Sequence, residues 1–401
     1  MKNSFISQAA NCNNPKWNYI ISRSAPLYKR PQDIRSEFER DYDRVIHTNA
    51  YRRLKHKTQV FFSPQNDHIC TRSEHVNIVE CISYTIAHCL GLNVELTKAI
   101  SLAHDIGHSP FGHRGEKILS DICVRDLGCT FWHEQNGLYL VDNIELLEDY
   151  EGFLQNLNLT YAVRDGIISH CGEIDENSLR PRDEFIDLEK YSHPNQYSPY
   201  TWEGCVVKIA DKISYIGRDI QDAISLGILD EHLSELYNLL DLPQDSKVKI
   251  NNTYIVNQLI SDLCENSSIQ KGLCFSDNAF SLLNNIKDFN YKNIYLCKKV
   301  NSSIHYFSLI INKIYDILFE NFDGINTFNK LDSLRKFYPT LVNSFTDWLM
   351  QYLIIRNQDL FKNKVLYNIE NKKDYSRAII EYISCMTDKF AIDIYNEIIG
   401  F

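Results

Sequence analysis

The chain has 401 residues, enough for one large domain or two of ordinary size. It carries 42 basic and 52 acidic side chains, which give a formal net charge of −10. Proteins that coat DNA regardless of its sequence depend on many Lys and Arg contacts with phosphates, so this acidity argues against such a function. A small anionic ligand is still compatible with it, because a metal ion and a few local cations can hold one.

Targeting signals are absent from the sequence. The N-terminal stretch MKNSFISQAANCNN lacks the unbroken apolar run of a signal peptide. No later segment approaches the roughly 18 apolar residues of a membrane span. The twelve cysteines are scattered and form no CxxC pair, which favours reduced thiols over a disulfide framework. We therefore expect a cytoplasmic protein without a membrane partner.

The first predicted elements are an irregular segment and two helices. Residues 1–40 contain three prolines and show no helical pattern. Residues 74–91 carry apolar side chains at every third or fourth position and end on Gly91, which suits a helix C-terminus. A second helix is expected over residues 94–105, stopping near Gly107.

Helical patterns continue to the end of the chain. Residues 201–224 form a third helix with one apolar stripe, and residues 305–322 and 345–361 repeat the pattern. Alternating strand patterns are few, so the sequence predicts an all-α fold. The polar segment 173–200, which contains three prolines, interrupts the helices. A connection of this length is either functional or mobile, and we interpret it as part of a lid or an oligomer contact.

The segment 102–113, LAHDIGHSPFGH, concentrates groups that bind metals or transfer protons in mainly hydrophobic surroundings. These groups are His104, Asp105, His108 and His113. Burying them without neutralising their charge is costly, so their density favours a metal or catalytic site over ordinary core histidines. Neighbouring helical residues point about 100° apart, so His104 and Asp105 bind one ion only from a helix end or across a wide arc. Other ligands must therefore come from elsewhere in the chain.

Two residues are suitable as these further ligands. His75 lies at the start of the helix expected over 74–91, and Asp211 lies on the polar face of the helix expected over 201–224. Neutral imidazoles and ionised carboxylates on rigid elements are ligands that divalent metals accept.

The polar face of the third helix carries more than one useful group. Asp211, Lys212, Tyr215 and Asp219 fall within roughly a 100° arc, opposite the isoleucine stripe. A carboxylate, an ammonium and a phenol in this arc are suited to a metal-bound phosphate. The alternative is a solvated helix face.

These residues resemble a known family. His75, the doublet His104–Asp105 and then Asp211 resemble the H…HD…D signature of the HD superfamily of metal-dependent phosphohydrolases. Five segments also occur in the order found in deoxynucleoside triphosphate triphosphohydrolases: RVIHTNAYRRLKHKTQVF, TRSEHVNIVE, LAHDIGHSPFGHRGE, FWHEQNG and ADKISYIGRDIQDA.

The resemblance covers about residues 40–225. It implies an HD-domain helical bundle with additional C-terminal helices. We accordingly divide the chain into an irregular N-terminal segment (1–40), an HD phosphohydrolase core (41–225) and a C-terminal helical region packed on the core (226–401).

The resemblance also implies a reaction. It is the hydrolysis of dGTP or of several dNTPs to the deoxynucleoside and inorganic tripolyphosphate, with a divalent ion such as Mn²⁺, Mg²⁺ or Co²⁺. The implied metal ligands are His75, His104, Asp105 and Asp211.

Residues matching the family's catalytic groups lie just downstream. His113 matches the catalytic histidine and Glu116 the carboxylate that accompanies it. If a helix begins near Arg114, their i, i+3 spacing lets the carboxylate orient the imidazole. His108 and His133 match further active-site histidines, although an ordinary buried histidine remains the alternative for His133.

Other positions match substrate contacts of the family. The matched residues are Arg72 and Lys212 for phosphates, Tyr215 for the triphosphate and for excluding a 2′-hydroxyl, Asp219 for the 3′-hydroxyl, and Gln59 for the sugar edge. Pairing with Glu74 or capping of the following helix is the alternative for Arg72. His88 and His170 match no family position, and we interpret both as structural.

The resemblance extends to partners. It implies a dNTP substrate and a homo-oligomer, either a hexamer or a tetramer. It leaves open a nucleotide activator and a single-stranded nucleic acid partner. The basic cluster RRLKHK, residues 52–57, fits a nucleic-acid patch or an effector site, and an exposed helix end is the simpler interpretation.

Two other functions remain alternatives at this level. One is an HD phosphohydrolase or phosphodiesterase that acts on another nucleotide. The other is a nucleotide- or nucleic-acid-binding regulator with a vestigial metal site. The complete set of candidate ligands argues against the second alternative, and the FWHEQ segment argues against the first.

Overall fold

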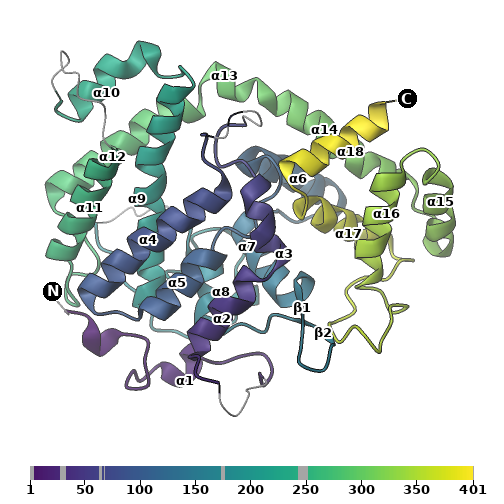
Figure 1. The fold of residues 1–401 in the computed structure, drawn as a ribbon, viewed down its shortest axis with the longest axis horizontal. Coiled ribbons are helices and arrows are strands. Elements are labelled where there is room, and N and C mark those ends of the chain that lie inside the picture. The colour runs from purple at the N-terminus through teal and green to yellow at the C-terminus, as the bar shows by residue number, and fades with distance from the viewer. Residues whose placement is uncertain are drawn as a thin grey trace. The chain divides into compact units, whose positions relative to one another are not determined.

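The structure is a computed structural model, and it describes residues 4–27, 33–62, 66, 68–172, 177–242 and 252–400. The described residues form α-helices, short helical turns and one two-stranded sheet, which confirms the all-α prediction (Figure 1). The chain divides into two compact units, and neither is continuous in the sequence. Unit 1 comprises residues 1–45, 59–105 and 158–302, and unit 2 comprises residues 46–58, 106–157 and 303–401.

Unit 1 contains the elements that carry the metal-ligand candidates. Its α-helices are α1 (Trp17–Ile20), α2 (Glu37–Ile46, whose last residue falls in unit 2), α4 (Arg72–Leu90), α5 (Val94–Ala103), α8 (Tyr161–Ser169), α9 (Trp202–Ser225), α10 (Leu233–Leu239), α11 (Asn252–Asn266), α12 (Asp277–Asn290) and α13 (Lys298–Asn301). Its helical turns are η1 (Ile6–Gln8), η4 (Leu188–Lys190), η5 (Asp230–His232) and η6 (Tyr291–Tyr295). Helices α4, α5, α8 and α9 pack against one another.

Local signals explain where the central helices of unit 1 begin and end. Thr71 and Glu74 form a capping box at the start of α4, and Gly91 ends this helix in the left-handed conformation, with φ 80°. The side chain of Asn93 caps α5 by accepting hydrogen bonds from two backbone amides. Helix α5 ends at Ala103, before the predicted end at residue 105, so that His104 is the C-cap.

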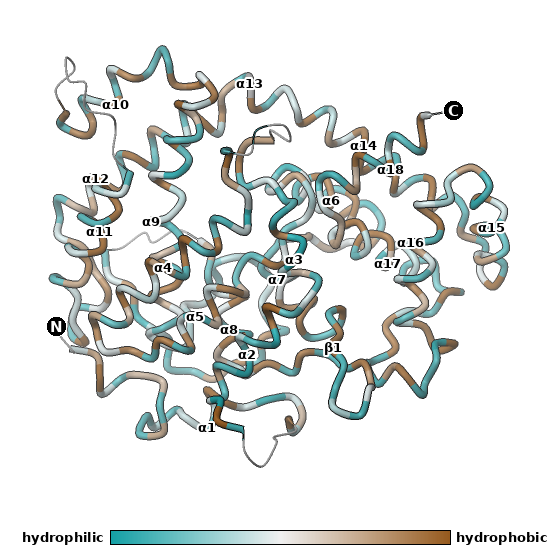
Figure 2. Tube along the Cα trace, in the orientation of Figure 1, coloured by the Kyte–Doolittle hydropathy of each residue, from teal (hydrophilic) through white to brown (hydrophobic). Residues whose placement is uncertain are grey.

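Helix α9 is buried on nearly all sides. The predicted stripe is in the core, and Lys212 and Asp219 on the opposite arc are buried as well. The alternative of a solvated face is therefore wrong. Figure 2 shows hydrophobic and hydrophilic residues alternating along α4 and α9, which fits helices that bury both an apolar stripe and a polar site.

The N-terminal and proline-rich segments are tied down in unit 1. Arg23 pairs with Asp41 at 2.5 Å and donates to the carbonyl of Asn158 at 2.7 Å. Within the described part of the segment 173–200, Arg182 forms a buried ion pair with Asp165, whose other oxygen accepts the amide of Tyr200 at 2.7 Å. Residues 177–200 are thus fastened to α8, and residues 173–176 of that segment lie outside the described part of the chain.

Unit 2 contains the other candidate residues. Its α-helices are α3 (Asn49–Arg53), α6 (Gly112–Asp126), α7 (His133–Tyr139), α14 (Ser303–Glu320), α15 (Thr327–Leu334), α16 (Pro339–Met350), α17 (Lys372–Ser384) and α18 (Asp388–Ile399). Its helical turns are η2 (Leu54–His56), η3 (Leu140–Ile144) and η7 (Gly324–Asn326). Strands β1 (Leu146–Glu148) and β2 (Leu154–Asn156) pair antiparallel, with Leu147 opposite Gln155.

One predicted helix of unit 2 is too long. Helix α16 ends at Met350, whereas the sequence predicts a helix through residue 361. Beyond it Ile354 and Ile355 are exposed, so the apolar residues there do not form one buried stripe. The chain turns instead, and Asn363 donates to the carbonyl of Gln351 at 3.1 Å.

The structure also describes the state of the cysteines and the apolar content of the helices. All twelve cysteines are free thiols. Among the described residues, no helix combines the length and the apolar composition that crossing a membrane requires.

Candidate functional site

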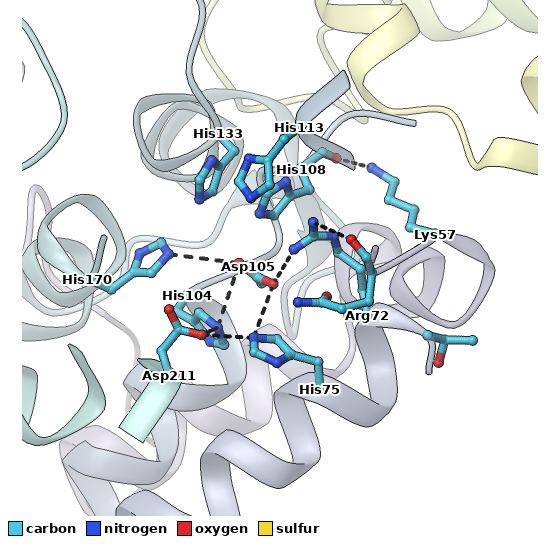
Figure 3. Close-up of polar contacts among 12 residues, drawn as sticks. Lys57, Arg72, His75, His104, Asp105, His108, His113, His133, His170 and Asp211 are labelled. Carbon is cyan, nitrogen blue, oxygen red and sulfur yellow. Dashed lines mark hydrogen bonds and ion pairs between the residues drawn. The ribbon is translucent and has the colours of Figure 1, made fainter. Parts of the chain in front are cut away.

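Four side chains of unit 1 converge from three helices. His75 lies in the first turns of α4, His104 caps the end of α5 with Asp105 directly after it, and Asp211 lies on α9 (Figure 3). Nε2 of His75 lies 2.9 Å from Oδ1 of Asp211 and 3.7 Å from Oδ2 of Asp105. Nε2 of His104 lies 3.6 Å from Oδ1 of Asp105 and 3.9 Å from Oδ1 of Asp211. The wide arc required by the neighbouring pair is present, because His104 ends the helix.

The donor set fits a divalent cation. Nδ1 of His104 lies 2.7 Å from the carbonyl of Ser101, and the N–H needed for this hydrogen bond leaves a lone pair on Nε2. Nε2 is buried and has no hydrogen-bond partner among the described residues. Burial lowers the pKa of His104, which favours the neutral imidazole. A neutral lone pair facing two carboxylates is repelled unless a cation lies between them, and a metal ion meets that need.

Two of the candidate ligands, His75 and Asp211, interact directly with each other. Burial alone would lower the pKa of His75, but the hydrogen bond and charge of Asp211 outweigh it and raise that pKa above its usual value. Burial would raise the pKa of Asp211, but the hydrogen bond and charge of His75 outweigh it and hold that pKa at about 2. Without a metal, an imidazolium–carboxylate pair is therefore favoured, and a bound cation takes the place of its proton.

Arg72 contacts the candidate metal ligand Asp105 rather than Glu74, its neighbour in the sequence. Its Nη1 lies 2.6 Å from Oδ2 of Asp105, and its side chain is almost fully buried. Glu74 is engaged by Thr71 in the capping box, so neither local alternative for Arg72 holds. A buried guanidinium at the edge of a metal-ligand group can contact a phosphate oxygen.

His170 is a residue that the sequence did not identify. It follows α8, its Nδ1 lies 2.7 Å from the carbonyl of Ile167, and its Nε2 lies 3.8 Å from Oδ1 of Asp105. Its ring meets that of His104 edge-on, with 4.9 Å between centroids. His104, Asp105 and His170 together could also hold a metal ion. The signal available in the sequence was a histidine at the end of an apolar helix, which ordinary core histidines share.

Two predicted triphosphate contacts line a pocket in unit 1. Lys212 and Tyr215 of α9 and Lys287 of α12 line it together with apolar residues such as Phe275. Two ammonium groups on one pocket are suited to an anion. Lys287 lies outside the segments that resemble the family, and for that reason the sequence did not identify it.

Asp219 is paired with another residue that the sequence missed. The hydroxyl of Tyr295 donates to Oδ2 of Asp219 at 2.5 Å. Burial raises the pKa of Asp219 to about 7 despite this hydrogen bond. Gln59, the predicted sugar contact, has a buried Oε1 that accepts no hydrogen bond from the described residues.

A second cluster lies in unit 2 and contains the predicted catalytic residues. Oε2 of Glu116 lies 3.3 Å from Nδ1 of His113, 3.0 Å from Nδ1 of His133 and 4.0 Å from Nδ1 of His108. Both His113 and Glu116 lie in α6, as the i, i+3 spacing requires. The rings of His108 and His133 stack, with centroids 3.7 Å apart. Figure 3 shows the three imidazoles side by side.

The electrostatics of this cluster centre on Glu116. Burial would raise the pKa of Glu116, but the neighbouring His133 and His113 hold it far below its usual range. The carboxylate is therefore ionised at any ordinary pH, and it can orient and stabilise a protonated imidazole. His113 is mostly exposed, whereas His108 and His133 are buried. His113 is thus the histidine of this cluster that most readily meets a ligand.

Comparisons with known proteins agree with this geometry. Residues 72–216 match the family model of the HD domain, and residues 342–397 match that of the phosphohydrolase-associated domain. The all-helical fold and the His75–His104–Asp105–Asp211 group thus define an HD-domain hydrolase.

The relatives identify the family within this class. The deoxyguanosinetriphosphate triphosphohydrolase-like protein of Rickettsia prowazekii is 32% identical over 388 residues, covering 93% of this chain and 94% of that protein. Its counterpart in Caldanaerobacter subterraneus is 31% identical over 379 residues, covering 94% of this chain and 89% of that protein. The chain belongs to the family of deoxyguanosinetriphosphate triphosphohydrolase-like proteins, which confirms the resemblance seen in its sequence.

Proposed function

We propose that the chain hydrolyses deoxynucleoside triphosphates, either dGTP or several dNTPs, to the deoxynucleoside and inorganic tripolyphosphate. The observation that carries the proposal is the buried lone pair of His104, which faces two carboxylates within 4 Å. The names of the relatives support this choice of substrate.

The proposed metal ligands are His75, His104, Asp105 and Asp211. When bound, a divalent ion such as Mn²⁺, Mg²⁺ or Co²⁺ would withdraw charge from an α-phosphate oxygen and lower the pKa of water. His170 would be a further ligand, since its Nε2 lies 3.8 Å from Oδ1 of Asp105 and the group His104, Asp105 and His170 could hold a metal ion.

The proposed substrate contacts combine charge with sugar recognition. Arg72, Lys212 and Lys287 would neutralise the triphosphate, which carries about four negative charges. Asp219, supported by Tyr295, would accept the 3′-hydroxyl. Tyr215 would pack under the sugar and exclude a 2′-hydroxyl, and Gln59 would contact the sugar edge.

The proposed proton-transfer groups are those of the second cluster. Water must attack the α-phosphorus while the 5′ oxygen leaves, so one proton is removed and one is supplied. His113 would exchange a proton with the reacting groups, and Glu116 would orient it and stabilise its charged form. His108 and His133 would assist as a stacked pair.

The oligomeric state, the cellular location and further binding partners are also part of the proposal. We propose a cytoplasmic homo-oligomer, a hexamer or a tetramer, and we keep a nucleotide activator and single-stranded nucleic acid as binding partners to be tested.

The test is a product analysis with metals varied. The four dNTPs are supplied separately and together with Mn²⁺, Mg²⁺ or Co²⁺, and chromatography follows nucleoside and tripolyphosphate. We expect equimolar nucleoside and tripolyphosphate, and turnover only in the mixture would reveal an activator. Release of pyrophosphate or orthophosphate alone would refute the proposal.

Matched variants test the ligand group. His104→Ala and Asp211→Asn should lower bound metal and reduce kcat/KM by at least about 100-fold. His88→Ala is the control, because His88 is an exposed histidine in α4 whose ring stacks on Tyr84. Metal content by elemental analysis should be unchanged in the control.

A further inference from the structure

The loop that leads from His108 into α6 has an unusual backbone. Phe111 has φ 64° and Gly112 has φ 59°, so two successive residues adopt the left-handed conformation. For a residue with a side chain this conformation is strained, and it persists only where surrounding contacts hold it. The loop lies between His108 and His113, two histidines of the second cluster.

Three polar side chains of unit 2 hold this loop by its backbone. Oδ1 of Asp388, at the start of α18, accepts the amide of Phe111 at 2.8 Å. Lys57 donates to the carbonyl of His108, as Figure 3 shows, and also to the carbonyl of Ser384 at 3.1 Å. Asn136 of α7 donates to the carbonyl of Gly107 at 2.7 Å.

Asp388 and Lys57 are also joined through the chain. The other oxygen of Asp388, Oδ2, accepts the amide of Thr58 at 2.9 Å. Asp388 therefore connects the loop to the residue that follows Lys57. The result is a brace, formed by Lys57, Thr58, Ser384 and Asp388, that attaches the loop to the C-terminal helices α17 and α18.

Burying a charged side chain has a large desolvation penalty, which argues against a purely stabilising role for Lys57 and Asp388. Lys57 is 2% exposed and Asp388 is 5% exposed. Replacing buried charges by apolar residues often leaves a protein equally stable or more stable. Here both charges are directed at backbone groups of one strained loop, and that loop connects His108 to α6, which carries His113 and Glu116.

We propose that Lys57 and Asp388 are positioning residues, which hold the loop 108–112 in the conformation that places His108 beside His113 and Glu116 of α6 for proton transfer. This inference rests on the proposed function of the second cluster. It gives the C-terminal helices a part in the reaction, since α17 and α18 supply Ser384 and Asp388 to the brace.

The experiment compares Asp388→Ala and Asp388→Asn with the matched control Asp374→Ala in the full chain. Asp374 lies in the first turn of α17, and its Oδ2 accepts the amide of Asn368 at 3.0 Å. It makes the same kind of bond to a loop that carries none of the proposed site residues. Asn at position 388 keeps one acceptor oxygen, and Thr387 still caps α18.

We expect Asp388→Ala to lower kcat about 10- to 100-fold with KM within about threefold of the parent value. Asp388→Asn should recover part of the loss. Metal content should not change, and the pH–rate profile should shift because His108 has moved relative to Glu116. Asp374→Ala should leave kcat and the profile unchanged. If Asp388→Ala does not fold, the comparison of Asp388→Asn with Asp374→Ala decides.

Hydrogen exchange separates this inference from the proposed function. Amides 108–113 should exchange faster in the Asp388 variants than in Asp374→Ala, whatever the substrate. If the parent enzyme releases no tripolyphosphate, the proposed function fails. If the parent is active and the Asp388 variants match it in kcat, or lose activity only as much as Asp374→Ala does, the positioning role is wrong.

Discussion

Asp219 is a buried carboxyl group whose surroundings prepare it to accept a second hydrogen bond. Burial raises the pKa of Asp219 to about 7 although Tyr295 donates to it. Below this pH the carboxyl group is protonated and neutral. Above it the ionised carboxylate can accept a further hydrogen bond, for which the proposed donor is the 3′-hydroxyl of the substrate.

The pH dependence of substrate binding follows from this pair. We expect KM for a dNTP to fall as the pH rises through about 7, because the ionised form accepts both donors. A 2′,3′-dideoxynucleoside triphosphate lacks the hydroxyl and should not show this fall. Steady-state KM values between pH 6 and 8.5 test it, and the same trend for both substrates would contradict the role of Asp219.

His170 gives a second prediction at the same scale. His170 forms a group with His104 and Asp105 that could hold a metal ion, so His170→Ala should weaken metal binding about tenfold. Isothermal titration with Mn²⁺ measures the change. An affinity equal to that of the parent would reduce His170 to the structural role that its sequence suggested.

The site could be predicted at the residue scale where residue type and spacing both carry information. The doublet His104–Asp105 and the arc that includes Asp211 have such patterns. Tyr295 does not, because its partner Asp219 is 76 residues away and only the packing of η6 on α9 joins them. Long-range pairs of ordinary residues leave no local pattern.

Among the elements, the proline-rich segment 173–200 differs most from what its composition suggested. Its composition suggested a lid or an oligomer contact, yet Arg182 ties its described part to α8 through Asp165. Arg182 also donates to the carbonyl of Ser198 at 2.6 Å. A buried side chain with this many partners fixes a segment that has little regular structure of its own.

Removing Asp165 from its ion pair with Arg182 should therefore lower the free energy of unfolding. Asp165→Ala leaves a buried guanidinium without its counter-charge and should lower the free energy of unfolding by about 3–5 kcal/mol. The control is Asp183→Ala in the same segment, where an exposed pair with Lys16 contributes less than about 1 kcal/mol. Urea unfolding of both variants measures the difference, and equal losses would contradict it.

Element boundaries were predictable only where caps or glycines mark them. Gly91 marks the end of α4 in the sequence and in the structure, whereas the capping box of Thr71 and Glu74 starts the helix at Arg72, two residues before the predicted start. After Met350 the apolar residues continue without a stop signal, and the chain forms turns there, with backbone hydrogen bonds from Tyr352 to Leu349 and from Arg356 to Leu353. Tertiary contacts override periodicity there.

At the scale of the molecule, the all-α class follows from periodicity along the whole chain. The division into units does not follow in the same way. The sequence predicts consecutive ranges, whereas the compact units alternate along the chain. Periodicity indicates which face of a helix is buried, but not which distant segment buries it.

Stability at this scale should depend on pH through buried carboxyl groups. Burial raises the pKa of Glu381 to about 8, with Tyr367 and Tyr139 as donors and Arg377 and Asp374 as charged neighbours. The unfolded chain loses this proton near pH 4.5, so the folded state alone retains it between about pH 4.5 and 8. The contribution is complete below pH 4.5 and decreases by about 1.4 kcal/mol per pH unit until about pH 8.

Glu381→Gln should remove this decrease. The free energy of unfolding of the parent should fall as the pH rises from 5.5 to 7.5, and the variant should show a smaller slope. Chemical denaturation at three pH values measures both slopes. Parallel curves would mean that Glu381 does not keep its proton in the folded state.

The alternation of the two units has a consequence for the gene. The doublet His104–Asp105 ends a stretch of one unit, and the next codon begins a stretch of the other. No single cut of the reading frame therefore yields either unit whole. A stop codon in place of codon 388 would remove Asp388 and the whole of α18, so premature termination that late should already inactivate the product.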